Sequence, residues 1–295
     1  MDIDLFLSQF MNGIVKGVVY ASLALALVLI FRATGILNFA QGEMALFSTY
    51  VTWWLTDQGL AVWLSIVVSM VLSFIGGALI ERIVIRPVER SSPLVIVIVT
   101  IGMFLAFNSL AQLIFGTDTK ELPRAYPLER WTIGGVNIDS DTVALVIVLI
   151  AECVLLWIFF NKTKAGLALR AVASNAESSR LVGISTGRML MLGWGLAAAL
   201  GALAGALIVP QTPALSSGSM QGVLVFSFAA AALGGFDSPV GAVVGGLIVG
   251  LAEVLTTTYV DALDSIELAL PFGLILAVLL VRPSGLFGTT RVERV

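Results

Sequence analysis

The sequence predicts an all-α polytopic membrane protein with about eight or nine transmembrane helices. Of its 295 residues, 58% are hydrophobic and only 12% are charged, whereas about a quarter of the residues in a soluble domain are charged. The mean hydropathy is +1.02. The apolar residues also form long unbroken runs of roughly the 20 residues that a helix needs to cross a bilayer. We therefore expect a single transmembrane domain over residues 1–295, without a separate soluble domain.

The first five apolar segments are separated by polar loops. Lys16 is the only charge within the first segment, and the third, fourth and fifth are strongly apolar. The second segment is less apolar, because it begins with the polar cluster Asn38, Gln41 and Glu43. We place these segments at residues 10–31, 36–55, 60–80, 93–115 and 142–160.

The last part of the chain holds four more segments. Residues 189–236 carry no charge, but they are too many for one crossing, and PQTPALSSG at 210–218 is the natural break. We place the segments at 189–209, 220–233, 240–256 and 266–281. The seventh is short and the second is polar at its start. Irregular backbone at membrane depth is tolerated only where it is buried in protein or lines a cavity, so these two are our candidates for broken or re-entrant helices.

A basic loop at residues 161–188 sets the expected orientation. Lys162, Lys164, Arg170, Arg180 and Arg188 are opposed there by Glu177 alone. Loops rich in Lys and Arg remain in the cytoplasm. Alternation of the segments then places most other basic residues and the C-terminus on the cytoplasmic side, and it places the acidic loop at 116–141 outside.

A short helix is predicted inside this basic loop. Ser174 and Glu177 have the spacing of a capping box, with Ser174 as the N-cap. Gly183 stands where a C′ glycine would end the helix about two turns later. We interpret the helix as a coupler that docks into a cytoplasmic motor protein; the alternative is a solvated loop that only sets topology. The candidate coupling residues are Arg170, Ser174, Asn175, Glu177, Arg180, Leu181 and Gly183.

Polar side chains inside apolar segments are the candidates for a translocation pathway. A charge at membrane depth costs a few kcal/mol or more, so Glu43, Glu152 and Glu253 should each be paired, protonated or facing water. We expect Glu43 near the cytoplasmic end of its helix, and Glu152 and Glu253 at helix–helix contacts. The candidate pathway residues are Asn38, Gln41, Glu43 and Asn108, with structural hydrogen bonding as the alternative role.

Three GxxxG pairs occur late in the chain, at 201–205, 241–245 and 246–250. Small residues let helix backbones approach closely in a membrane. We expect these pairs to serve tight packing within the subunit, with a subunit interface or a sliding pore wall as the alternative.

Catalytic chemistry is not expected. The chain has no histidine, its one cysteine, Cys153, lies in an apolar run, and it has no GxxxxGK[ST] phosphate loop. We therefore expect no catalytic residues, no metal site, no cofactor bound by this chain and no nucleic-acid partner.

Several longer motifs resemble a known family. They are NGIVKGVVYASLALALVLI at 12–30, GILNFAQGEM at 35–44, ERIVIRPVERSS at 81–92, GLALRAVASNAESSRLVGI at 166–184, ALGGFDSPVGAVVGGLIVGLAE at 232–253 and RPSGLFG at 282–288. Together they resemble the permeases of branched-chain amino-acid ABC importers, in particular the shorter of the two paired membrane subunits.

This resemblance implies a transport subunit of the bacterial inner membrane that works by alternating access. Its partners would be a second, longer permease, two ABC ATPases that use the ATP, and an extracytoplasmic solute-binding protein. Residues 166–186 would form the loop that contacts the ATPases. An importer of urea or short amides remains an alternative, as does a secondary transporter that couples ions through Glu43, Glu152 or Glu253.

Overall fold

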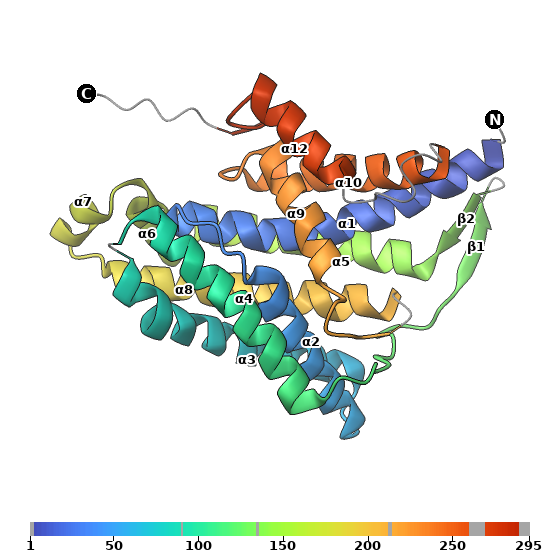
Figure 1. The fold of residues 1–295 in the computed structure, drawn as a ribbon, viewed down its shortest axis with the longest axis horizontal. Coiled ribbons are helices and arrows are strands. Elements are labelled where there is room, and N and C mark those ends of the chain that lie inside the picture. Colours follow the sequence, from blue (N-terminus) through green and yellow to red (C-terminus); the bar gives the residue numbers. More distant parts are fainter. Residues whose placement is uncertain (1–2, 90, 134–135, 212–213, 260–268, 289–295) are drawn as a thin grey trace. The chain divides into compact units, whose positions relative to one another are not determined.

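The computed structural model describes residues 3–89, 91–133, 136–211, 214–259 and 269–288. The chain, whose helices and strands are labelled in Figure 1, forms two compact units. Unit 1 consists of residues 1–28, 126–150 and 222–295, and unit 2 of residues 29–125 and 151–221. Within these described ranges, six helices are long and apolar enough to cross a membrane. They are α1 (Ile3–Thr34), α3 (Val62–Ile80) with its continuation to Val88, α4 (Pro93–Phe115), α5 (Ser140–Lys162), α8 (Thr186–Ile208) and α10 (Pro239–Tyr259).

Three further helices, which fall in predicted membrane segments, are shorter than the roughly 20 residues of a full crossing. They are α2 (Gln41–Asp57), α9 (Gln221–Gly234) and α12 (Ala269–Val281), with 17, 14 and 13 residues. The predicted all-α polytopic fold is confirmed, and the predicted count of eight or nine depends on these three helices. The start of the ninth predicted segment, residues 266–268, lies outside the described residues.

Unit 1 is built on close contacts between small residues. A Cβ atom added at Gly250 would collide with the backbone of Gly17, and one added at Gly246 would lie 2.6 Å from the backbone nitrogen of Ala21. These contacts join α10 to α1. Gly245 faces the backbone of Ala230 in α9 in the same way. The late GxxxG pairs in α10 therefore pack helices within the subunit, as predicted.

A β-hairpin in unit 1 interrupts the helical pattern. Strands β1 (Arg130–Ile133) and β2 (Val136–Asp139) pair antiparallel, with Arg130 opposite Asp139. The two side chains form an ion pair at 2.6 Å. The hydrogen bond to Asp139 raises the pKa of Arg130 above its ordinary value. The sequence predicts only an exterior loop here.

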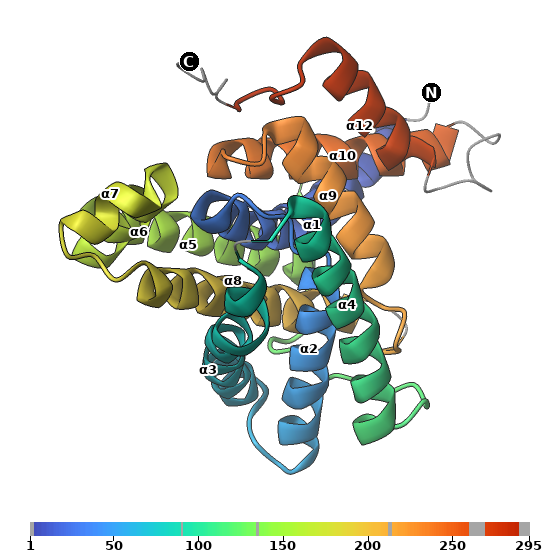
Figure 2. The ribbon, with the colours of Figure 1, turned by 60° about the vertical axis from the view of Figure 1, so that its left-hand side comes forward.

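Unit 2 is built around α8, which packs against both α3 and α2 (Figure 2), and these two helices also contact each other. A Cβ at Gly77 of α3 would lie 2.6 Å from the carbonyl oxygen of Trp194, which shows how closely α3 approaches α8. On another side of α8, Gly201 and Gly205 face Ala45 and Thr49 of α2. The residue numbers of these contacting pairs increase together along both helices, so α2 and α8 run in the same direction. Phe115 of α4 stacks on Tyr50, with ring centroids 5.2 Å apart, and covers the far side of α2.

The basic loop contains two helices, α6 (Lys164–Ser174) and α7 (Ala176–Leu181), where the sequence analysis predicts one. Thr163 is the N-cap of α6: its Oγ1 accepts a hydrogen bond from the Gly166 nitrogen at 3.0 Å. It also donates to the Phe159 carbonyl at 2.6 Å. This bonding fixes the corner between α5 and α6.

Candidate translocation and coupling sites

The N-terminus of α7 is capped by Asn175. Its Oδ1 accepts a hydrogen bond from the Ser178 nitrogen at 2.8 Å. Ser174 is the last residue of α6, so the prediction that Ser174 is the N-cap is wrong by one residue. The reason is that Asn175 adopts the extended backbone of a cap and that asparagine caps as well as serine. Glu177 remains in the first turn, where a negative charge favours the helix dipole.

The C-terminus of α7 is closed by Gly183, as predicted. Gly183 has a φ of +85°, which a residue with a side chain rarely adopts. Its nitrogen donates to the Arg180 carbonyl at 3.0 Å, and the Ile184 nitrogen donates to the Ser179 carbonyl at 2.9 Å. This pair of bonds is the Schellman motif. Both ends of α7 are therefore held by hydrogen bonds.

α7 is attached to α8 and presents an apolar tip. Arg180 Nε donates to Thr186 Oγ1, in the first turn of α8, at 3.0 Å. Leu181 and Val182 are 88% and 75% exposed. Two exposed apolar side chains on a short fixed helix form a contact surface of a kind that a solvated loop does not require. Arg170, the remaining predicted coupling residue, lies on α6.

The four predicted pathway residues come together around the start of α2. Asn38 Nδ2 donates to Gln41 Oε1 at 3.2 Å, and Gln41 Nε2 donates to the Ala197 carbonyl of α8 at 2.9 Å. Asn108 Nδ2 of α4 donates to Glu43 Oε2 at 3.0 Å and to the Ser217 carbonyl at 2.8 Å. These bonds link α2, α4, α8 and the segment after α8.

Two neighbours of this cluster complete its polar contacts. Gln112 Nε2 donates to Asn108 Oδ1 at 2.6 Å, which orients the Asn108 amide towards Glu43. Glu43 is only 1% exposed. Its Oε1 is buried and has no hydrogen bond of normal geometry within the described residues, although the Gln221 side chain lies close enough to interact with the carboxylate. Glu43 therefore retains accepting capacity inside the protein.

The depth of Glu43 differs from the prediction. Gln41 is bonded at the level of Ala197, which is the twelfth residue of the 23-residue helix α8. At 1.5 Å per residue this level is roughly 17 Å from the start of α8, about halfway along it. Residues 36–40 before α2 are not helical. Glu43 does lie near the end of its own helix, as predicted, because it is in the first turn of α2. That end, however, lies in the middle of unit 2, so Glu43 is at mid-depth and not at a surface.

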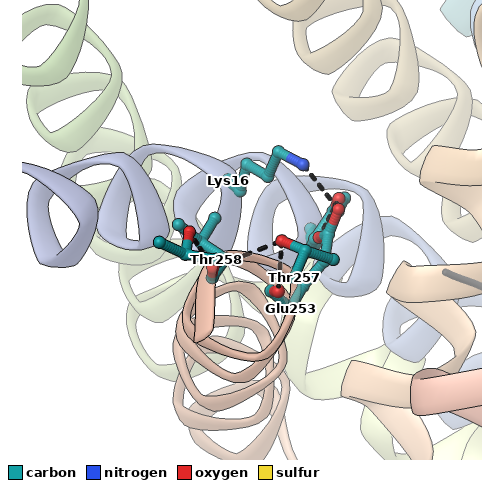
Figure 3. Close-up of polar contacts among 6 residues, drawn as sticks. Lys16, Glu253, Thr257 and Thr258 are labelled. Atoms are coloured by element: carbon teal, nitrogen blue, oxygen red, sulfur yellow. Dashed lines mark hydrogen bonds and ion pairs between the residues drawn. The ribbon is translucent and has the colours of Figure 1, made fainter. Parts of the chain in front are cut away.

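Glu152 and Glu253, the other two carboxylates predicted at membrane depth, both have interaction partners. Glu253 of α10 forms an ion pair with Lys16 of α1 at 2.5 Å (Figure 3). It also accepts a hydrogen bond from the Tyr20 hydroxyl at 2.5 Å. Thr257 donates its hydroxyl to the Glu253 carbonyl, one turn back on α10. Glu152 is also buried and has interaction partners. The prediction that Glu253 joins two helices is confirmed.

The apolar crossing helices define a multi-pass membrane protein. Residues 9–279 match the family described as the permease component of the branched-chain amino acid transport system. The chain belongs to this family, which confirms the resemblance predicted from its motifs.

Known relatives agree with this assignment. The chain is 32% identical to the high-affinity branched-chain amino acid transport system permease protein LivH of Escherichia coli K12, over 98% of both chains. It is 28% identical to the corresponding permease protein BraD of Pseudomonas aeruginosa, again over 98% of both. Among solved structures, PsaBC from Streptococcus pneumoniae in complex with Fab covers 92% of this chain and 91% of its own, with a TM-score of 0.50 and 14% identity, a likeness of fold alone.

Proposed function

We propose that this chain is the permease subunit of an ATP-driven ABC importer for branched-chain amino acids. It forms the translocation pathway with a second, longer permease of the LivM type and receives solute from an extracytoplasmic binding protein. Two ABC ATPases use the ATP, and this chain binds no cofactor. The names of the full-length relatives, LivH and BraD, support this substrate class.

The proposed topology follows the sequence analysis. Residues 1–295 form one permease domain in a bacterial inner membrane, with α2, α9 and α12 as additional membrane segments beside the six long helices. The basic loop and the C-terminus lie in the cytoplasm.

The observation that carries the coupling role is the exposed apolar tip of α7. The centres of protein interfaces are apolar and rimmed by polar groups, and Leu181 and Val182 are bordered by Arg180 and the exposed Glu177 and Asn175. Because both ends of α7 are hydrogen-bonded and Arg180 is bonded to α8, a displacement of the tip moves α8 as well. We propose that the ATPases act on the pathway through this connection.

The proposed pathway passes the cluster of Asn38, Gln41, Glu43 and Asn108. Start points of discontinuous helices at mid-membrane are typical substrate sites in transporters. An amino acid carries an ammonium group, and the carboxylate of Glu43 is an acceptor suited to it. In the present arrangement the cluster is closed by its own hydrogen bonds. Passage of solute therefore requires α4 or α8 to move away from α2.

The coupling role is tested by comparing Leu181→Asp with Leu181→Met in the assembled transporter, reconstituted in proteoliposomes. A charge buried at an apolar interface costs several kcal/mol, so the Asp variant should lose at least about tenfold of its ATPase binding and its uptake of leucine. The Met variant preserves an apolar tip and should remain active. Normal uptake by Leu181→Asp would contradict the coupling role.

The substrate class has its own measurement. Unlabelled valine and isoleucine should compete with labelled leucine for uptake, and urea should not. Uptake driven by a proton or sodium gradient in the absence of ATP would overturn the proposed mechanism.

A further inference from the structure

The motif at residues 81–92 begins where α3 ends, and the proposed function gives it no role. Residues Glu81–Ile85 form one turn of π-helix, and the Arg86 nitrogen donates to the Glu81 carbonyl across it. Residues five apart point to different sides of an α-helix, because one turn takes about 3.6 residues. The wider turn of a π-helix brings them to the same side, and such turns are frequent at functional sites. The local backbone therefore places the Arg86 side chain beside that of Glu81.

The Arg86 guanidinium bridges this carboxylate and the start of α8. Its Nε and Nη2 donate to the two Glu81 oxygens at 3.2 and 2.6 Å, and Nη2 also donates to the Gly187 carbonyl at 2.8 Å. Glu81 is only 1% exposed, and a buried carboxylate requires a cationic partner that also satisfies its oxygens. A Cβ atom at Gly187 would lie 3.0 Å from Arg86 Cζ, so the absence of a side chain there lets the guanidinium approach closely. Glu81 thus fixes the direction of a cation that holds α8.

The first turn of α8 is bonded to arginines from two different elements. Arg180 of α7 donates to Thr186 Oγ1, and Arg86 at the end of α3 donates to the carbonyl of the next residue, Gly187. Farther along α8, Gly77 of α3 meets its backbone directly. A displacement that α7 imposes on the start of α8 must therefore carry α3 with it or break the bond from Arg86.

We propose that Arg86 is a positioning residue for transport. It holds the end of α3 on the first turn of α8, so that both helices move together when α7 is displaced, and Glu81 acts through Arg86 by orienting the guanidinium. This inference rests on the proposed coupling role of α7 and adds a second helix to the connection. Packed helices and hydrogen-bond networks with discrete arrangements carry energetic coupling between distant sites. Without Arg86, α8 follows α7 while α3 lags, and part of the ATP hydrolysis then leaves the pathway unchanged.

The test measures ATP hydrolysis and leucine uptake by the assembled transporter in the same proteoliposomes. Arg86→Gln should keep its hydrolysis within about twofold and lose about tenfold of its uptake, because hydrogen bonds to charged groups are lost. The amount of ATP hydrolysed per leucine therefore rises. The matched control Arg82→Gln removes the same charge from an exposed position of the same segment and should leave this ratio within about twofold of the parent. Arg86→Lys retains the charge without the fork and should give an intermediate ratio.

The role of Glu81 is tested by combining substitutions. Glu81→Gln should raise the ratio less than Arg86→Gln does, because an amide oxygen still accepts one hydrogen bond from the guanidinium. Once Arg86→Gln is present, adding Glu81→Gln should change the ratio by less than about twofold, since residues that act as one unit are not additive. A further increase as large as that of Glu81→Gln alone would contradict the orienting role.

Each outcome decides the proposal. A raised ratio in Arg86→Gln with a parental ratio in Arg82→Gln supports it, whereas a parental ratio in Arg86→Gln or equal increases in both variants overturn it. If Arg86→Gln does not assemble, Arg86→Lys decides: a raised ratio supports the proposal, and a proportional loss of both activities shows that Arg86 only stabilises the fold. A parental ratio in Arg86→Gln beside the expected loss in Leu181→Asp overturns this inference alone. Normal uptake by Leu181→Asp overturns the coupling role of α7 and this inference with it.

Discussion

The packing of α3 on α8 can be tested with two adjacent glycines of α3, only one of which faces α8. Gly77 faces α8, and a Cβ atom there would lie 2.6 Å from the Trp194 carbonyl oxygen and 2.7 Å from the Ala198 Cβ. Gly76, one residue earlier in the same helix, has no heavy atom within 4 Å of the corresponding position. Gly77→Ala therefore introduces a collision, and Gly76→Ala introduces the same atom into open space.

The two substitutions share one energy contribution and differ in another. Alanine favours a helix over glycine by roughly 0.5–1 kcal/mol at either position. Carbon atoms pack best about 3.5–4.0 Å apart, so at Gly77 the helices must separate by about 1 Å. Inserting a methyl group into a tightly packed interface typically costs about 1–3 kcal/mol. Gly76→Ala should stabilise the protein slightly, and Gly77→Ala should be about 1–3 kcal/mol less stable than Gly76→Ala.

The assay is reversible unfolding of the full chain in mixed micelles, followed by the fluorescence of its tryptophans. Because the helix preference is common to both variants, the difference between their unfolding free energies isolates the collision. Equal unfolding free energies for Gly76→Ala and Gly77→Ala would refute the inferred contact between α3 and α8.

Three further predictions concern the buried charges and the topology. A double-mutant cycle of Lys16→Met and Glu253→Gln, measured by unfolding, should give a coupling free energy of about 1–2 kcal/mol. This is less than for a fully buried pair, because half of the Lys16 side chain is exposed. Additive effects of the two substitutions would contradict the ion pair. Glu43→Gln should reduce uptake in vesicles more than Glu152→Gln does, since only Glu43 lies in the proposed pathway, and the opposite ranking would remove Glu43 from it. A reporter fused after Val295 should give a cytoplasmic signal, whereas an exterior signal would reverse the proposed topology.

Most helix positions can be predicted from hydropathy, and some ends can be predicted to the residue. The fourth segment, predicted at 93–115, matches α4, because Pro93 begins the helix and Gly116, with a φ of +85°, ends it. Both signals are local and need no tertiary information.

The errors arise where local signals compete or where the decisive contacts are distant in sequence. Ser174 and Asn175 are both good caps, and only the end of α6 at Ser174 selects the second. Helix α6 is amphipathic and basic, so hydropathy alone classifies it as loop, although the cap Thr163 before a run of helix-forming residues is a usable signal. The four-residue strands of the hairpin are too short for their pattern to stand out.

The sequence predicts which residues form the candidate pathway site, but it does not predict how deep in the protein they lie. Polarity within an apolar segment is enough to select Asn38, Gln41 and Glu43. Their mid-depth placement depends on the bond from Gln41 to Ala197, which is 156 residues away in the chain. Position along the sequence specifies the order of the helices but not the level at which a short helix begins.

Helix α8 is a single rod that bears on both candidate sites. Its first turn is bonded to α7 through Arg180 and Thr186, and in its second half the glycines Gly201 and Gly205 contact side chains of α2. A continuous helix transmits a tilt along its length. A rotation imposed on α8 at the loop end therefore displaces the Ala197 carbonyl that Gln41 contacts, with no intermediate hinge. Gly201 and Gly205 hold α8 so close to α2 that even a sub-ångström displacement of α8 must alter the hydrogen bonds around Glu43.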